Sequence, residues 1–502
     1  MPDYMFQLES RLSNEQRAAL VRMVELGAAT GTNIYLAGGA VRDLISGMPI
    51  RDLDFIVEGN PTRILRELEK GGAQVLEEDD RLRRAELIFA GDVDGSLSAA
   101  RDEVYIRPGT TPEIRWSTIM EDLRRRDFSL NSIAISLNPA SRGLLLDPTN
   151  GLSDLEKREL RALSIHSFTN QPVRLLRSLR FAARLGLKLE TRTKEWFDLA
   201  IERRLYEQIS PEEAGEELRQ LAREDKPGAV LKAWETNGLL STVAPQLAKR
   251  HPDYDALIRL GRAREDLLSA GLRPRLAIPT AAAILGRLSP GEMSSVLHRA
   301  KFRAADISAV LKLESEAKKV EKILAGRKTA VPRDAFALLE KTPLELVAYL
   351  IAESKKSQAR AKMRNYLQKW RPIQMNIPSV ANELEILGMP RGPKFDKVVE
   401  DFFHMQLAGK GKTPEDRTRL LRKLSGIKES PKKPEKVEKK KAVPKSHDKS
   451  AGKIEAMQAA KARAAANVKP IPGGKSVHSA PKKSPAKSKS SGKKSKGTKK
   501  KK

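Results

Sequence analysis

The sequence predicts an α/β head, built as a small mixed sheet with helices, then an elongated all-α neck, body and tail, and a disordered basic C-terminus. Three observations lead to this order. Short β-prone runs alternate with helical segments between about residues 33 and 139, which is typical of an α/β domain. After Gly151 the pattern is helical and stays so. Residues 431–502 contain no Phe, Trp or Tyr and are rich in Lys, Pro, Ser, Gly and Ala, so they cannot bury a core.

The predicted elements divide the chain into five parts. Residues 1–30 are expected to form one amphipathic N-terminal helix, and the head follows at 31–150. The neck is expected at 151–245, the all-α body and tail at 246–430, and the disordered lysine-rich tail at 431–502. The β runs expected in the head are 34–37, 54–57, 86–90, 103–107 and 132–137.

Helix boundaries after the head carry their own signals. Ser210 followed by Pro211 and two glutamates predicts a helix start, because proline suits the first helical position and acids suit the first turn. Gly238 predicts a helix end. Further interruptions are expected at Pro290, Pro332 and Pro378.

Composition excludes several classes of protein. The 502 residues contain no cysteine, which excludes disulfides, thiolate zinc sites and a cysteine redox role. The N-terminus lacks a basic segment followed by an apolar one, and no apolar run approaches the length of a membrane span. We therefore expect a cytoplasmic protein that has no membrane partner.

The net charge of +30 is concentrated at the C-terminus. Residues 431–502 hold 24 Lys+Arg and 4 Asp+Glu, a net +20. Such a tail is either a solubilising extension or a sequence-independent contact with the phosphate backbone of a nucleic acid. We favour the second interpretation.

Two glycines and two aspartates carry the strongest chemical signal. Gly38 and Gly39 follow a β-prone run and precede a helix, so the backbone can approach a phosphate there. Asp52 and Asp54 are two residues apart on a predicted strand and point to the same face. Taken singly, a Gly-Gly pair is usually a turn and an Asp-x-Asp pair a solvated strand edge. Together, a phosphate cradle beside two carboxylates predicts a divalent cation and phosphoryl or nucleotidyl transfer.

The chain resembles the class II nucleotidyltransferases, which include bacterial CCA-adding tRNA nucleotidyltransferases and poly(A) polymerases. The resemblance begins at the Gly-Gly and Asp-x-Asp motifs and continues through three segments in the family's order. Residues 124–131 (RRRDFSLN) are similar to the family's RRDFTxN segment, residues 147–155 (DPTNGLSDL) to its DxxxGxxDL segment, and residues 172–181 (PVRLLRSLRF) to its base-reading helix. Residues 387–393 and 409–420 look like the family's tRNA-facing tail domain.

The resemblance implies roles for particular residues. Asp52 and Asp54 are the expected catalytic residues and ligands of Mg²⁺. The expected nucleotide-binding residues are Gly38, Gly39, Arg42, Arg126, Asp127, Asp147, Gln171, Arg174 and Arg177. The alternative for residues 124–126 is a solvated basic face. The alternative for Arg174 and Arg177, which lie three residues apart on a helix that continues with two more arginines, is an RNA-facing or ion-paired surface.

Two positions depart from the family pattern. Gln171 stands where the family has aspartate, and an amide can either accept or donate, so tolerance of uracil or guanine is expected. Ser96 stands in the strand where the family usually has a third acid, so a lower rate is expected unless Asp94 takes that role.

The sequence thus predicts an α/β nucleotidyltransferase head and a template-independent RNA nucleotidyltransferase. Its first expected partner is an RNA, most simply the 3′ end of a tRNA. Its second is a nucleoside triphosphate, for which ATP is expected and CTP is the further candidate. One alternative is 3′ adenylation of the poly(A) polymerase type. Another is a catalytically weak paralogue that mainly binds structured RNA. The order of nucleotide addition stays open.

Overall fold

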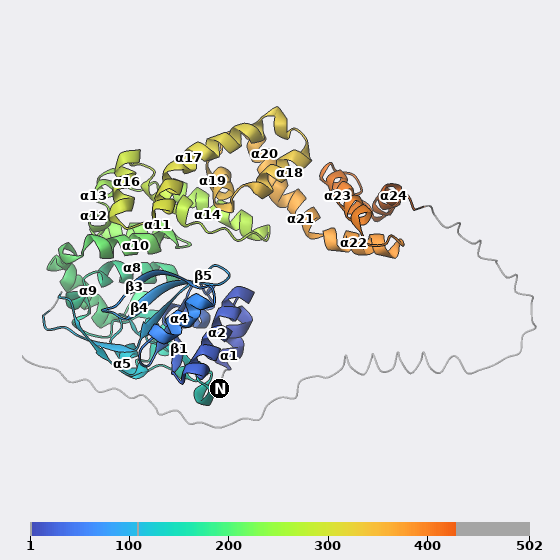
Figure 1. Cartoon of the computed structure of the whole chain (residues 1–502). Helices are drawn as coiled ribbons and strands as arrows, with labels where there is room; N and C mark the ends of the chain where they lie inside the picture. The colour runs from blue at the N-terminus through green and yellow to red at the C-terminus, as the bar shows by residue number, and fades with distance from the viewer. Residues whose placement is uncertain (1–2, 108–109, 428–502) are drawn as a thin grey trace, which may run out of the picture. The chain divides into compact units, whose positions relative to one another are not determined.

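The head is built on a mixed sheet. The computed structural model describes residues 3–107 and 110–427 (Figure 1). A seven-stranded sheet has the order β3-β4-β5-β2-β1-β8-β9. Its strands are β1 (Ile34–Ala37), β2 (Leu53–Val57), β3 (Gln74–Asp79), β4 (Arg84–Phe89), β5 (Val93–Ala99), β8 (Ala134–Ser136) and β9 (Leu145–Leu146). The predicted tail at 431–502 lies outside the described residues.

Alternation along β2 decides which face of the sheet carries the aspartates. β2 pairs in parallel with β5 and antiparallel with β1. Leu53 and Phe55 point into an apolar core that also contains residues of α1 (Tyr4–Arg11), α2 (Asn14–Thr30), α3 (Gly39–Ile45) and α4 (Thr62–Lys70). Ile56 belongs to a smaller cluster that includes Leu123 of α5 (Ile119–Arg124), on the opposite face. Asp54 shares the face of Ile56, because residues two apart on a strand point the same way.

Several predicted elements need correction. The single helix expected over 1–30 is two helices, because Ser13 caps the second one and exchanges hydrogen bonds with Gln16. The run expected at 103–107 is instead β6 (Arg101–Val104), which pairs with β7 (Glu113–Trp116) in a separate two-stranded sheet. The chain after Gly151 also includes two short parallel strands, β10 (Glu159–Leu160) and β11 (Lys188–Leu189).

Apart from β10 and β11, residues 151–245 are mainly helical. Ser210 caps α10 in a capping box with Glu213, and Gly238 has φ 73° after the end of α11. Trp234 is fully buried there, and its indole N–H donates to the carbonyl of Leu176 at 3.0 Å. The neck helices are α6 (Gly151–Lys157), α7 (Ser167–Asn170), α8 (Arg174–Leu185), α9 (Thr191–Glu202), α10 (Pro211–Ala222), α11 (Pro227–Thr236), α12 (Leu240–Val243) and α13 (Pro245–Arg250).

The body and tail are also helical, and the predicted interruptions at Pro290, Pro332 and Pro378 fall at helix starts. A π-helical turn, Tyr366–Trp370, joins two of the helices. The helices are α14 (Tyr254–Ser269), α15 (Ala277–Leu285), α16 (Pro290–Arg299), α17 (Ala304–Ala325), α18 (Pro332–Lys341), α19 (Leu344–Glu353), α20 (Ser357–Asn365), α21 (Arg371–Met375), α22 (Ile377–Ile386), α23 (Pro393–Leu407) and α24 (Pro414–Ser425).

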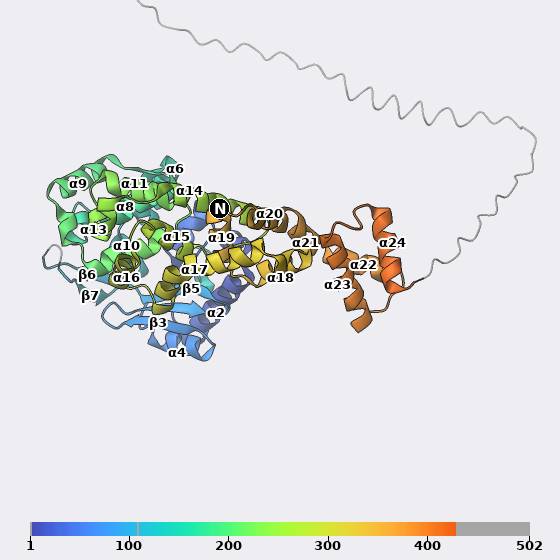
Figure 2. The same ribbon diagram turned by 90° about the horizontal axis from the view of Figure 1, so that it is seen from above.

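The last three helices have a core of their own. α22, α23 and α24 pack on one another around Val380, Leu384, Phe395, Phe402 and Leu421 (Figure 2). A larger core, which contains Trp234, begins at Phe168 and also includes Phe403 and Leu407 of α23. None of the helices within the described ranges is long and apolar enough to cross a membrane.

Candidate active site

The predicted Gly-Gly turn joins β1 to α3. Gly38 has φ 67° and ψ −121°, a backbone conformation that residues with a side chain rarely adopt. A Cβ atom at Gly38 would lie 2.9 Å from Nη1 of Arg126. The amide of Gly38 donates to the carbonyl of Ile133 at 3.1 Å, so this N–H is already satisfied by the protein. The backbone conformation therefore favours glycine at this position, and the guanidinium of Arg126 occupies the space beside it.

Three charged side chains converge on Gly39. A Cβ atom placed there would lie 3.7 Å from Oδ1 of Asp52, from Oδ2 of Asp54 and from Nη2 of Arg42. These residues come from the start of β2 and from α3, and the register of β1 against β2 brings the two elements together. Without a Cβ at Gly39, the space between the carboxylates and the guanidinium stays open.

The electrostatics of the two aspartates fit a divalent cation. Both carboxylates are half-buried. Burial and then the negative charges of Asp54 and Asp43 raise the pKa of Asp52 to about 6, against the opposing effect of Arg42 and Arg223. Two adjacent carboxylate groups supply the oxygen ligands that Mg²⁺ prefers, and a bound cation relieves their repulsion. The donor set therefore fits the metal that the resemblance implies.

The third acid is missing from this group. Ser96 is buried, and its hydroxyl donates to Oδ1 of Asp54 at 2.6 Å. Asp94 is turned to an ion pair with Arg223 at 3.9 Å, and Glu86, which lies opposite Ser96 on β4, pairs with the arginine two residues before it. Within residues 3–107 and 110–427, no group of three or more metal-ligating side chains could hold a metal ion. The structure thus agrees with the expected loss of a third carboxylate and gives Asp94 a different partner.

Arg42 is held rigidly beside the aspartates. Only 4% of it is exposed. Its Nε donates to Oδ1 of Asp43 at 2.9 Å, and its Nη1 donates to Oδ1 of Asn131 at 2.7 Å. Its guanidinium lies 4.9 Å from the ring centre of Phe181 on α8. Asn131 belongs to the predicted 124–131 segment but was not among the predicted site residues.

The predicted pair Arg126 and Asp127 links this group to the neck. Arg126 donates to the carbonyl of Asn131 at 3.0 Å and to Oδ2 of Asp122 at 3.1 Å. Asp127 is buried and forms an ion pair with Nη1 of Arg177 at 3.1 Å. Burial disfavours the charged form of Asp127, but the nearby arginines outweigh it and hold its pKa below the usual range. Asp127 is buried and Arg126 partly buried, and both are paired, so Arg126 does not belong to a solvated basic face, whereas Arg124 is exposed.

The predicted base-reading residues form one hydrogen-bonded chain. Nε of Arg174 donates to Oε1 of Gln171 at 3.0 Å, and Nη1 of Arg174 donates to the hydroxyl of Ser167 at 3.0 Å. The amide nitrogen of Gln171 donates to the hydroxyl of Tyr105, which in turn donates to Glu103 at 3.1 Å. Both ends of the Gln171 amide thus have partners, so the expected free choice between donor and acceptor is restricted.

The arginine row on α8 is an ion-paired surface. Nε of Arg177 and Nε of Arg180 donate to the two oxygens of Glu217 on α10 at 3.0 and 2.8 Å. Nη2 of Arg184 donates to Oδ2 of Asp43 in the head at 2.6 Å. Sequence reasoning missed Glu217, which is 1% exposed. Glu217 stands at helical spacing within the apolar stripe of Ala214 and Leu218, and an acid in such a stripe was the signal that could have found it.

Asp147 has a structural role. Its two carboxylate oxygens accept hydrogen bonds from the amides of Gly151 and Leu152, at 2.7 and 2.9 Å. These are the first amides of α6, so Asp147 starts that helix. Nucleotide binding by Asp147 stays a prediction.

A Gly-Gly turn that faces an Asp-x-Asp strand within a mixed sheet, backed by a helical neck, defines a nucleotidyltransferase head. The Poly A polymerase head domain family matches residues 34–161. The A-adding tRNA nucleotidyltransferase of Halalkalibacterium halodurans is 36% identical over 219 residues, which are 43% of this chain. The CC-adding tRNA nucleotidyltransferase of Deinococcus radiodurans is 33% identical over 301 residues, which are 58% of this chain and 76% of the relative. The chain belongs to the class II nucleotidyltransferase family.

Coverage differs among these relatives. This chain spans 51% of the length of the Halalkalibacterium enzyme and 45% of that of the A-adding enzyme of Geobacter sulfurreducens. A solved apo form of a CCA-adding enzyme is similar over 85% of this chain and 99% of its own, with a TM-score of 0.45 and 21% identity.

Proposed function

We propose that this protein is a template-independent nucleotidyltransferase that adds nucleotides to the 3′ end of an RNA, and that this RNA is tRNA. The observation that carries the proposal is the convergence of Asp52, Asp54 and Arg42 on the open space at Gly39. Two repelling carboxylates beside a fixed guanidinium suit a triphosphate and its metal. The chain's family supports tRNA as the substrate, and so do the names of its relatives, which are tRNA nucleotidyltransferases.

Mg²⁺ is the cofactor proposed for Asp52 and Asp54. When bound there, it supplies the Lewis acid that lowers the pKa of a 3′-hydroxyl and stabilises the leaving pyrophosphate. Arg42, fixed by Asp43 and Asn131, presents its remaining N–H groups to the triphosphate. Gly39 leaves room for this contact, and Ser96 holds the carboxylate of Asp54 in one orientation.

The nucleotide base is proposed to lie against α8. Arg174 is 7% exposed and is oriented by Gln171 and Ser167, which limits the positions from which it can donate to a base. The relatives include A-adding, CC-adding and multifunctional CCA enzymes, so ATP and CTP are the proposed substrates and the choice between them is left to experiment.

A matched set of RNAs tests the proposal. The full chain and Mg²⁺ are incubated with each labelled nucleoside triphosphate separately and with tRNA lacking its 3′ CCA, tRNA ending in CC, or an unstructured RNA. Incorporation of C into the first tRNA or of A into the second supports the proposal and identifies the type of enzyme. Long A tracts on unstructured RNA would instead indicate a poly(A) polymerase. RNA binding without any incorporation would indicate the catalytically weak paralogue, the alternative that the missing third acid favours.

A further inference from the structure

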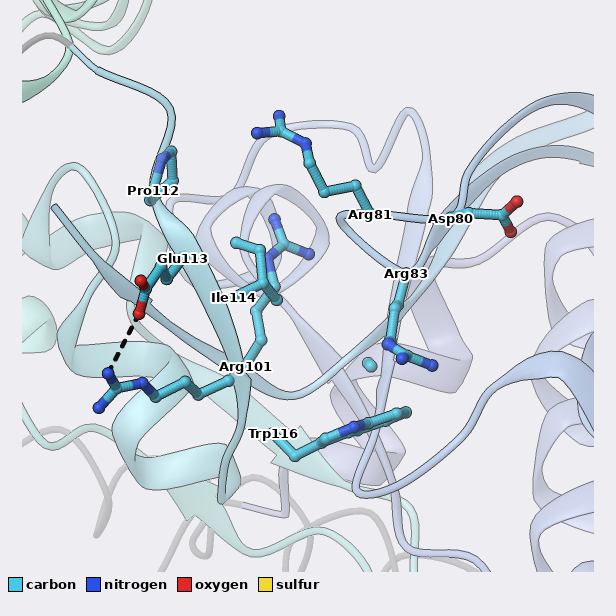
Figure 3. A pocket seen from close by; sticks show the side chains of 10 residues that line it. Asp80, Arg81, Arg83, Arg101, Pro112, Glu113, Ile114 and Trp116 are labelled. Atoms are coloured by element: carbon cyan, nitrogen blue, oxygen red, sulfur yellow. Dashed lines mark hydrogen bonds and ion pairs between the residues drawn. The ribbon is translucent and has the colours of Figure 1, made fainter. Parts of the chain in front are cut away.

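A cavity of 570 Å³ lies in the head away from the aspartates. One of its lining residues, Ala99, is the last residue of β5, whereas Ser96, which contacts Asp54, lies three residues earlier. At the rise of a β-strand, this separates the two positions by about 10 Å along the strand. The side chains that line the cavity are shown in Figure 3.

Two walls form the cavity, and both are anchored. One is the turn between β3 and β4, which contributes Arg81 and Arg83, and the other is the β6–β7 pair, which contributes Trp116. The carbonyl of Arg83 accepts from the amide of Ala99 at 3.0 Å, and the carbonyl of Leu82 accepts from Arg101 at 2.9 Å. Arg83 has φ 49°, a left-handed conformation that non-glycine residues rarely adopt.

The lining of the cavity is cationic. Four arginines and two carboxylates line the cavity. Arg115 pairs with Glu113 at 3.2 Å, and Arg101 pairs with Glu103 at 3.2 Å. No ion pair among the described residues includes Arg81 or Arg83. Figure 3 shows the Arg81 side chain extending outward from the turn.

Trp116 provides an aromatic surface next to these cations. The guanidinium carbon of Arg83 lies 4.2 Å from the centre of the indole ring. Even so, 48% of Trp116 stays exposed, an unusual exposure for a large aromatic residue. An exposed indole beside unpaired arginines combines the two elements with which proteins bind single-stranded nucleic acids: a surface for base stacking and cations for the backbone.

We propose that this cavity binds an unpaired nucleotide of RNA, with the base stacked on Trp116 and the phosphate held by Arg81 and Arg83. The site goes beyond the proposed function, because it requires neither the aspartate pair nor a nucleoside triphosphate. It gives the head a contact with single-stranded RNA that is separate from the site of nucleotide transfer.

Binding without catalysis tests the proposal. The full chain is titrated with a labelled 12-nucleotide single-stranded RNA and with a blunt RNA duplex, in the absence of Mg²⁺ and nucleoside triphosphates. Trp116→Ala should weaken binding of the single strand by about 5- to 100-fold, as loss of a stacked base does, and should leave duplex binding unchanged. Trp116→Phe should retain most of the affinity, and thermal melting shows that each variant is folded.

The arginines have a charge-matched control. Arg83→Ala should weaken binding of the single strand more than Arg66→Ala, which removes an exposed arginine of α4 outside the cavity. Intrinsic fluorescence should be quenched by the oligonucleotide in the wild type and less in Trp116→Phe. If Trp116→Ala binds both RNAs like the wild type, or loses affinity for both equally, the stacking site is wrong. These outcomes do not depend on nucleotide incorporation, so they separate this site from the proposed enzyme activity.

Discussion

Ser96 and Asp54 lie opposite each other on the parallel strands β5 and β2, and the Ser96 hydroxyl donates to Oδ1 of Asp54 at 2.6 Å. The position where the family usually has a third acid therefore holds a donor that fixes one of the two remaining acids. This hydrogen bond leaves Oδ2 of Asp54 facing Gly39, where Asp52 and Arg42 also converge. The residue that stands at the position of the missing acid thus orients the carboxylate of Asp54.

Ser96→Ala should slow nucleotide incorporation by about fivefold, because a hydrogen bond that orients a charged group contributes about 1 kcal/mol. The affinity for RNA should not change, since Ser96 is buried. Single-turnover rates at saturating RNA measure the effect. A rate equal to that of the wild type would show that Asp54 needs no such support.

Asp52→Ala or Asp54→Ala should lower incorporation by about 100-fold or more, because each change removes a carboxylate that is proposed to hold the metal. RNA affinity should stay nearly constant, because these groups are proposed to hold the metal rather than to contact RNA. Incorporation and RNA binding are measured on the same preparations. Wild-type incorporation by both variants would show that the metal site lies elsewhere.

Gln171→Asp should sharpen the preference for CTP and ATP over UTP and GTP, because a carboxylate accepts from an exocyclic amino group and rejects a keto oxygen. The wild type should discriminate less well, although the contacts of Gln171 with Arg174 and Tyr105 restrict its amide. The ratio of kcat/KM values for the four nucleotides measures this. A wild-type enzyme that already excludes UTP and GTP strongly would contradict the prediction. In that case, the contacts of the amide explain the discrimination.

Glu217→Ala should destabilise the fold by about 3–5 kcal/mol, because it leaves the buried Arg180 and the partly buried Arg177 without their shared carboxylate. Chemical denaturation gives the free energy of unfolding. Glu213→Ala, at the exposed start of the same helix, is the control and should cost only about 1 kcal/mol through its capping box. Equal losses in the two variants would show that the buried network adds no stability.

Deletion of residues 431–502 should weaken RNA binding most at low salt and flatten its salt dependence. The segment carries a net +20, so its loss reduces the number of counterions released on binding. The described cores lie entirely before residue 428, so the head should keep its activity at saturating RNA. RNA affinity is measured against salt concentration for the full chain and for a chain that ends at Ser430. Identical slopes would indicate a solubilising or otherwise targeted extension.

Much of the fold was predictable because local chemistry determines it. Proline and capping residues set the helix starts at Pro211, Pro290 and Pro332. An apolar, β-prone run placed Asp54 on a strand, and the Gly-Gly turn was predicted directly before a helix. The break of the N-terminal helix at Ser13 was missed, because a capping box inside a continuous apolar pattern is a weak signal.

The sequence by itself predicted which groups would carry the chemistry: two aspartates, a glycine pair and an arginine in one short stretch, together with the residues that match the family. Only the tertiary structure decided how these groups are paired. Arg177 meets Asp127 and Glu217 across 50 and 40 positions of the chain, and Arg184 meets Asp43 across 141. Such contacts depend on the packing of α8 between the head and α10, and no local pattern encodes them. The physical reason is that burial makes an unpaired charge costly, so the fold, rather than the local sequence, selects each arginine's partner.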